Sequence, residues 1–152
     1  MRALSPHAFE QHQADLLARF DRLGRTTLGT AGKRHRKLTF DVYVPGVPGL
    51  ADSAHFHYEE WFRRSSKGWL RIRYNYNYRD LVRGGWRGYH LHPLDGHGPE
   101  PVPHAKCVEP NGDGAHNHYD AYEVDLRAAH DEFETLYAMD TPIECEGLTS
   151  ID

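Results

Sequence analysis

The sequence predicts a single α+β domain, residues 1–152, in which a mostly antiparallel sheet of about five strands carries an N-terminal and a C-terminal helix on one face. Apolar residues recur at helical spacing near both ends of the chain. Between these ends, apolar and polar residues alternate over several short segments, as they do in half-buried strands. The length suffices for one hydrophobic core, and an aromatic content of 12% favours large buried side chains.

The two helices are predicted from their start signals and their apolar stripes. Ser5 can cap a helix that starts at Pro6, and the stripe places this helix at residues 6–23. Asp125 can cap the second helix, which runs to about Met139. The stripes consist of Phe9, Leu16, Leu17, Phe20 and Leu23 in the first helix and of Leu126, Ala129, Phe133, Leu136 and Tyr137 in the second.

The segments between the helices are predicted as strands and loops from alternation and from turn residues. Residues 38–44 alternate and form a strand, which follows a basic loop at 24–37 that is either solvated or in contact with phosphate. Residues 93–115 are rich in Pro and Gly and are expected to be mostly loop. The remaining strands are expected at 54–62, 69–78 and 89–92, near 104–108, and from 116 to 123.

A hairpin with a three-residue loop, Ser66 to Gly68, is expected at the centre of the sheet. This loop pairs Phe62 with Ile72 and Tyr58 with Tyr76, so that the aromatic residues share one face. The opposite face is then polar, and it is either solvated or a functional site. We expect that face to carry His55, His57, Glu59, Trp61, Arg71, Arg73, Asn75 and Asn77.

Composition and charge exclude several classes of protein. A formal net charge of −4 with neutral histidines argues against an overall basic nucleic-acid binder, although a local basic face is compatible with it. No segment is apolar enough to cross a membrane, and residues 1–10 lack the apolar run of a signal peptide. Two cysteines are too few for a disulfide scaffold. We therefore expect a cytoplasmic protein without membrane contact.

Histidines are concentrated in residues 89–119, which hold six of the twelve in this histidine-rich chain. Two imidazoles beside a cationic side chain can cleave RNA, because one takes the proton of the 2′-hydroxyl, the other protonates the leaving oxygen, and the cation stabilises the phosphorane. This ribonuclease mechanism needs no metal or cofactor. The expected catalytic residues are His90, His92, His104 and Lys106, and the expected substrate-binding residues are Arg71, Arg73, Tyr89, Tyr119 and His57.

Metal binding is the alternative use of these histidines. On a strand, a His-x-His pair places both imidazoles on one face, where they can bind zinc or another divalent transition metal. A turn could also bring His104 and Cys107 to one ion. In that interpretation the ligands are expected among His116, His118 and His104, with zinc as the first choice.

Residues 55–137 contain three short motifs in a fixed order before the C-terminal helix, namely Arg71-Ile72-Arg73-Tyr74, the pair of His90 and His92, and Pro103-His104-Ala105-Lys106. In this order the motifs resemble those of the TumE-like toxins of toxin–antitoxin systems. The resemblance implies a growth-inhibiting toxin that acts on RNA, a nuclease-type site at the last two motifs, and an antitoxin as protein partner. The N-terminal helix and the pair of His116 and His118 have no place in the family pattern.

Three functions follow from these patterns. The first is a small ribonuclease-like enzyme, a toxin or defence component that cleaves RNA phosphodiesters by histidine acid–base catalysis. The second is a non-catalytic module whose polar sheet face binds nucleic acid or protein. The third is a metal-dependent hydrolase built on the His-x-His pairs.

Overall fold

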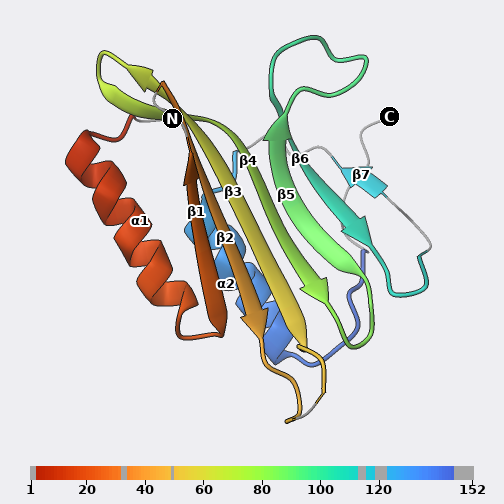
Figure 1. Cartoon of the computed structure of the whole chain (residues 1–152). Helices are drawn as coiled ribbons and strands as arrows, with labels where there is room; N and C mark the ends of the chain where they lie inside the picture. The colour runs from red at the N-terminus through yellow and green to blue at the C-terminus, as the bar shows by residue number, and fades with distance from the viewer. Residues whose placement is uncertain (1–2, 32–33, 49, 113–115, 119–122, 146–152) are drawn as a thin grey trace.

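The computed structural model describes residues 3–31, 34–48, 50–112, 116–118 and 123–145, and Figure 1 shows their arrangement. This part of the chain forms one antiparallel sheet whose strands follow one another in sequence order, together with two helices. The elements are α1 (Pro6–Phe20), β1 (Arg25–Ala31), β2 (His35–Val44), β3 (Ala54–Ser65), β4 (Gly68–Asp80), β5 (Trp86–His92), β6 (Val102–Val108), β7 (His116–His118) and α2 (Leu126–Ala138).

The predicted α+β fold is confirmed, with both helices packed on the same face of the sheet (Figure 1). Ser5 caps α1 and Asp125 caps α2, as predicted. From α1, Phe9 packs edge-on against Phe62 with ring centroids 4.9 Å apart. From α2, Phe133 lies 6.0 Å from the ring of Tyr89 on β5. The buried aromatic layer between helices and sheet leaves the other sheet face, which we call the open face, without a helix.

The strand count is higher than predicted, since the sheet has six strands of seven or more residues and a three-residue seventh. The predicted basic loop at 24–37 is wrong, because Arg25–Ala31 forms β1 and pairs along its whole length with β2. Glycine and basic residues indicate a loop, but an edge strand tolerates them when its neighbour supplies the hydrogen bonds. The strand predicted near 104–108 begins earlier, at Val102.

The β3–β4 hairpin contains an irregularity that the sequence did not reveal. Its turn has two residues, because Ser65 pairs with Gly68, and the expected three-residue loop is wrong. The register then shifts between Trp61 and Phe62, so that Ile72 is the extra residue of a β-bulge. Beyond the bulge the predicted pairing of Tyr58 with Tyr76 is restored.

The bulge exchanges the faces of the hairpin tip. Phe62 pairs with Arg71 and not with Ile72, so Arg71 lies on the helix face beside Glu60. Trp69 likewise turns toward the helices and contacts Phe9. The prediction that Arg71 belongs to the polar face is therefore wrong, and the cause is a single inserted residue.

A disulfide joins Cys107 on β6 to Cys145 beyond α2. Although the chain has no disulfide scaffold, this bond ties the segment after α2 to the helix face of β6. Disulfides are rare in reducing compartments, so the cytoplasmic location stays a prediction. Among the described helices, none has the length and apolarity that crossing a membrane requires.

Candidate metal centre on the open face

The strand register brings residues from five strands into rows across the open face. One row runs Asp41, His57, Asn77, Gly88, Lys106 from β2 to β6. The row beside it runs Thr39, Glu59, Asn75, His90, His104. The alternation that buries the aromatic residues on one face therefore collects polar and ionisable side chains on the other.

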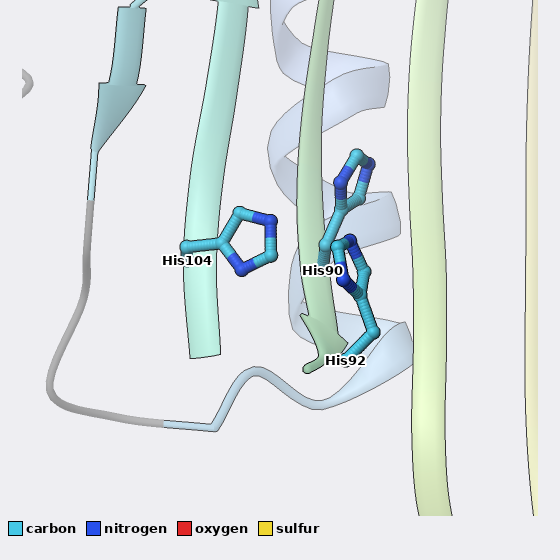
Figure 2. A group of neighbouring side chains, drawn as sticks. All are labelled: His90, His92 and His104. Atoms are coloured by element: carbon cyan, nitrogen blue, oxygen red, sulfur yellow. The ribbon is translucent and has the colours of Figure 1, made fainter. Parts of the chain in front are cut away.

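Three imidazoles meet where β5 and β6 lie side by side. His90 and His92 project from β5 and His104 projects from β6, and their rings gather on the side of the sheet away from α2 (Figure 2). The ring centroid of His104 lies 4.6 Å from that of His92 and 5.3 Å from that of His90. One ring nitrogen of each residue lies within 4.8 Å of the other two. We call these residues the histidine triad.

Hydrogen bonds fix which nitrogen of each triad ring carries the proton. Nδ1 of His92 donates to the Pro93 carbonyl at 2.8 Å, and Nδ1 of His104 donates to the Val102 carbonyl at 2.9 Å. Nε2 of His90 donates to Oδ1 of Asn77 at 2.9 Å. The lone pairs therefore belong to Nε2 of His92, Nε2 of His104 and Nδ1 of His90. Partners of this kind orient the ligands of natural metal sites.

Burial keeps two of the three imidazoles neutral. His90 is 7% exposed and His104 is 1% exposed. Burial, followed by the charges of His104, Lys106 and His92, lowers the pKa of His90 to about 3. For His104, burial lowers the pKa, and the hydrogen bond to the Val102 carbonyl offsets only part of this effect. Neutral imidazole is the form that binds a metal ion.

The second layer around the triad is built by Gly88, Asn77 and Trp86. The Trp86 ring stacks on His90, with centroids 6.1 Å apart. Gly88 has no side chain, and a Cβ at this position would lie 2.2 Å from Oδ1 of Asn77 and 3.0 Å from Nε2 of His90. The absence of a side chain at Gly88 therefore allows Asn77 on β4 to pass over Gly88 and bond to His90 on β5. Asn77 was predicted on the polar face of the hairpin, but its hydrogen bond to His90 was not predicted.

The predicted catalytic residues lie together, whereas the predicted substrate-binding residues do not. Lys106 lies on the open face beside the triad, and Arg73 and His57 are on that face too. Arg71 and Tyr89 lie on the helix face, where the Tyr89 hydroxyl donates to Glu132 at 2.5 Å. Tyr89 is adjacent to His90 on the same strand, so the two side chains point to opposite faces of the sheet. Tyr119 lies outside the described residues.

The ligand set expected for a metal is only partly supported. His104 belongs to the triad, but with His90 and His92. The backbone of His116 and His118 forms β7, and their side chains lie outside the described part of the structure. Cys107 cannot join His104 at one ion, because it faces the helices and is bonded to Cys145.

A second group of ionisable residues occupies the β2–β3 side of the open face. Oδ1 of Asp41 lies 2.7 Å from Nε2 of His55 and 2.7 Å from Nδ1 of His57. The predicted co-facial arrangement of His55 and His57 is confirmed. Asp41 was not predicted, because its strand partner depends on a register that a connection as long as residues 45–53 does not fix. We call these three residues the aspartate cluster.

No protein-family model matches the chain, and no curated protein and no solved structure matches it. The function must therefore be argued from the site.

Proposed function

We propose that the protein is a metal-dependent phosphodiesterase that acts on RNA, in which the histidine triad binds one divalent transition metal ion. The observation that carries this proposal is the convergence of three imidazoles whose protonated nitrogens are already engaged by Asn77 and two backbone carbonyls. Zinc is the first choice, since imidazole is a preferred ligand and catalytic zinc sites use three protein ligands with one open position.

The spacing of the triad supports a metal better than it supports two-histidine acid–base catalysis. A tetrahedral ion with bonds of about 2.1 Å holds its ligand atoms about 3.4 Å apart. The triad nitrogens lie within 4.8 Å of one another, so they need to close by no more than about 1.4 Å. Acid–base catalysis needs a pKa near the working pH, and the pKa of about 3 for His90 lies far below it.

The surrounding side chains suit a phosphodiester. A bound ion would polarise the phosphoryl oxygen and lower the pKa of a water molecule. Lys106 supplies a cation beside the triad for the charge that develops on phosphorus. Arg73 is exposed on the same face, where its guanidinium lies over the Trp61 ring at 5.3 Å and offers a second cation to a phosphate of the substrate. RNA as substrate, and a role as toxin or defence component, belong to this proposal.

Removal and return of the metal test the proposal. The protein is stripped with a chelator, dialysed and assayed on single-stranded RNA before and after one equivalent of Zn²⁺, Mn²⁺ or Ni²⁺ is added. We expect cleavage to disappear on stripping and to return with one of the ions. His104→Gln should not recover, whereas His7→Gln, an exposed histidine of α1, should behave as the wild type.

A metal-free ribonuclease is the second candidate, because His92 is less buried than its two partners and is accessible to a substrate on the open face. Unchanged cleavage after stripping, combined with loss of cleavage in His92→Ala, would establish it in place of the metal mechanism. Binding of RNA without any product, in the stripped and the reloaded protein, would instead favour a non-catalytic module.

A further inference from the structure

The aspartate cluster has the ligand types and the spacing of a metal site of its own. One potential ligand atom from each of Asp41, His55 and His57 lies within 4.8 Å of the other two. Oδ1 of Asp41 lies 2.7 Å from Nε2 of His55 and 2.7 Å from Nδ1 of His57, close to the roughly 3.0 Å between neighbouring ligands of an octahedral ion with bonds of about 2.1 Å. Two imidazoles and one carboxylate on one face are a common ligand set for divalent iron and related ions.

Neighbouring side chains hold this group in place. The His55 ring stacks in parallel on Tyr43, with centroids 4.3 Å apart and an interplanar angle of 3°. Nε2 of His57 lies 3.4 Å from Oε1 of Glu59, and Lys37 pairs with the same carboxylate oxygen at 2.7 Å. Glu59 thus lies beside the cluster, where its carboxylate could supply a further oxygen ligand to an ion. The ring of each histidine is also oriented by a contact with a residue other than Asp41.

We propose that Asp41, His55 and His57 form a second divalent-cation site, distinct from the histidine triad. His57 is on β3 and His90 is on β5, so two strand spacings, about 10 Å, separate the two groups. That distance is too long for one ion, or for a pair of ions that share a ligand, because paired metal sites place their ions about 3.5–4 Å apart. The two sites therefore load independently.

The two ligand sets predict different metal preferences. The triad offers three neutral nitrogens, which suit Zn²⁺ or Ni²⁺. The aspartate cluster adds a carboxylate, and it accommodates oxygen-preferring ions such as Mn²⁺ and Fe²⁺. The pKa of Asp41 is raised by burial but is lowered more by its bonds to His57 and His55, so the carboxylate is charged at neutral pH.

An ion at the aspartate cluster would also change the charge of the open face. Without a cation, Asp41 adds a negative charge to the β2–β3 side of this face, whereas the charge of Glu59 is already paired with Lys37. A bound dication would offset the charge of Asp41 and extend the cationic surface from Lys106 toward β2. This consequence rests on the proposed action on RNA, whereas the metal site itself does not.

Metal titration of the intact chain tests the second site. Mn²⁺ is added to stripped protein whose triad has been filled with one equivalent of Zn²⁺, and bound Mn²⁺ is counted from the loss of its free-ion EPR signal. We expect one equivalent of Mn²⁺ in the wild type and in His7→Gln. We expect the same in His104→Gln, to which no Zn²⁺ is added, because without the triad that Zn²⁺ would occupy the aspartate cluster. In His57→Gln and Asp41→Asn we expect its affinity to fall at least tenfold.

Unchanged Mn²⁺ binding in both cluster variants would overturn the proposal, as would the absence of Mn²⁺ binding in the wild type. Circular dichroism and thermal unfolding check that each variant is folded, and His55→Gln replaces any variant that is not. The outcome is separate from that of the proposed function, because His104→Gln removes the triad's ion and the RNA cleavage but leaves the Mn²⁺ equivalent in place.

Discussion

The two groups of ionisable residues on the open face use the same His-x-His pattern in opposite electrostatic settings. In the histidine triad, His90 and His104 are buried, their proton-bearing nitrogens bond to neutral amide and carbonyl oxygens, and the charged neighbour is Lys106. In the aspartate cluster, both imidazoles are partly exposed and bond to one carboxylate oxygen.

The difference shows that the ligand spacing of a His-x-His pair does not by itself define its chemistry. Neutral hydrogen-bond acceptors orient the triad's imidazoles without adding negative charge. A carboxylate acceptor ties up the imidazole protons and adds negative charge, so an ion there must replace hydrogen bonds. The cross-strand neighbours, Asn77 in one case and Asp41 in the other, determine the contrast.

The largest predicted difference between the two groups is the effect on RNA cleavage of removing one imidazole from each. His104→Gln should lower RNA cleavage by more than about a hundredfold, because loss of a ligand costs more than loss of a ligand's partner, which is typically 10- to 100-fold. His57→Gln should lower it by less than about tenfold, through weaker substrate binding alone. Initial rates under saturating Zn²⁺ measure both. Equal losses in the two variants would mean that the groups form one site.

Removal of Asn77, the hydrogen-bond partner of His90, should have a smaller effect that is confined to the Zn²⁺ affinity of the triad. Asn77→Ala removes the acceptor that holds Nε2 of His90, and we expect the triad's Zn²⁺ affinity to fall by about 10- to 100-fold. Asn75→Ala is the matched control, since Asn75 pairs with His90 across the strands but is not its hydrogen-bond acceptor. Competition with a chromophoric chelator reports both affinities. Similar values for the two variants would contradict the role given to Asn77.

The burial of the triad predicts how the stripped protein responds to acid. Below pH 6.5 an unfolded histidine takes up a proton, but folded His90, with a pKa of about 3, stays neutral. Stability is therefore greatest above pH 6.5 and falls with decreasing pH, by up to about 1.4 kcal/mol per pH unit for each such group. Denaturant unfolding at pH 7.5 and 5 should show a smaller decline in His90→Gln. The decline in His7→Gln should match the wild type.

Replacement of the aromatic ring that stacks on a histidine has the smallest predicted effect on metal affinity. Each of the two groups has one such ring. Trp86 stacks on His90 and Tyr43 stacks on His55, and each contact contributes about 0.5–1.5 kcal/mol. Trp86→Leu should weaken Zn²⁺ binding at the triad, and Tyr43→Leu should weaken Mn²⁺ binding at the aspartate cluster, by roughly two- to tenfold. Each substitution should leave the other ion's affinity unchanged. A change in both affinities would show that the two sites are coupled.

Alternation predicted the faces of the sheet well wherever the register was regular. It placed His55 and His57 together, assigned Tyr58, Tyr74 and Tyr76 to the core, and made His90 and His92 co-facial. It failed where the backbone departs from strict pairing, because a bulge reverses every assignment beyond it. Capping residues located both helices, since their hydrogen bonds are local in sequence.

The composition of the site was only partly predictable for the same reason. His90, His92, His104 and Lys106 were predicted from alternation within each strand and from the resemblance to the toxin family, and the pairing of β5 with β6 places them side by side. The contacts of Asp41 and Asn77 with their histidine partners were not predicted, because they depend on the exact register between neighbouring strands. Tyr89 was predicted to bind substrate on the same face as His90, but neighbouring residues of a strand point to opposite faces, and Tyr89 points to the helices.

The bulge at Ile72 also determines how the hairpin tolerates changes in length. Deletion of the extra residue Ile72 would give a regular register in which Arg71 and Trp69 keep their faces. Deletion of Leu70 would act like a frameshift, because Trp69 would then lie next to Arg71 in sequence and point to the opposite face. Trp69 forms paired backbone hydrogen bonds with Leu4 just before α1, at 2.6 and 2.7 Å, and its ring packs on Phe9. The loss of one residue at the hairpin tip would thus remove the contact that anchors the N-terminal helix to the sheet.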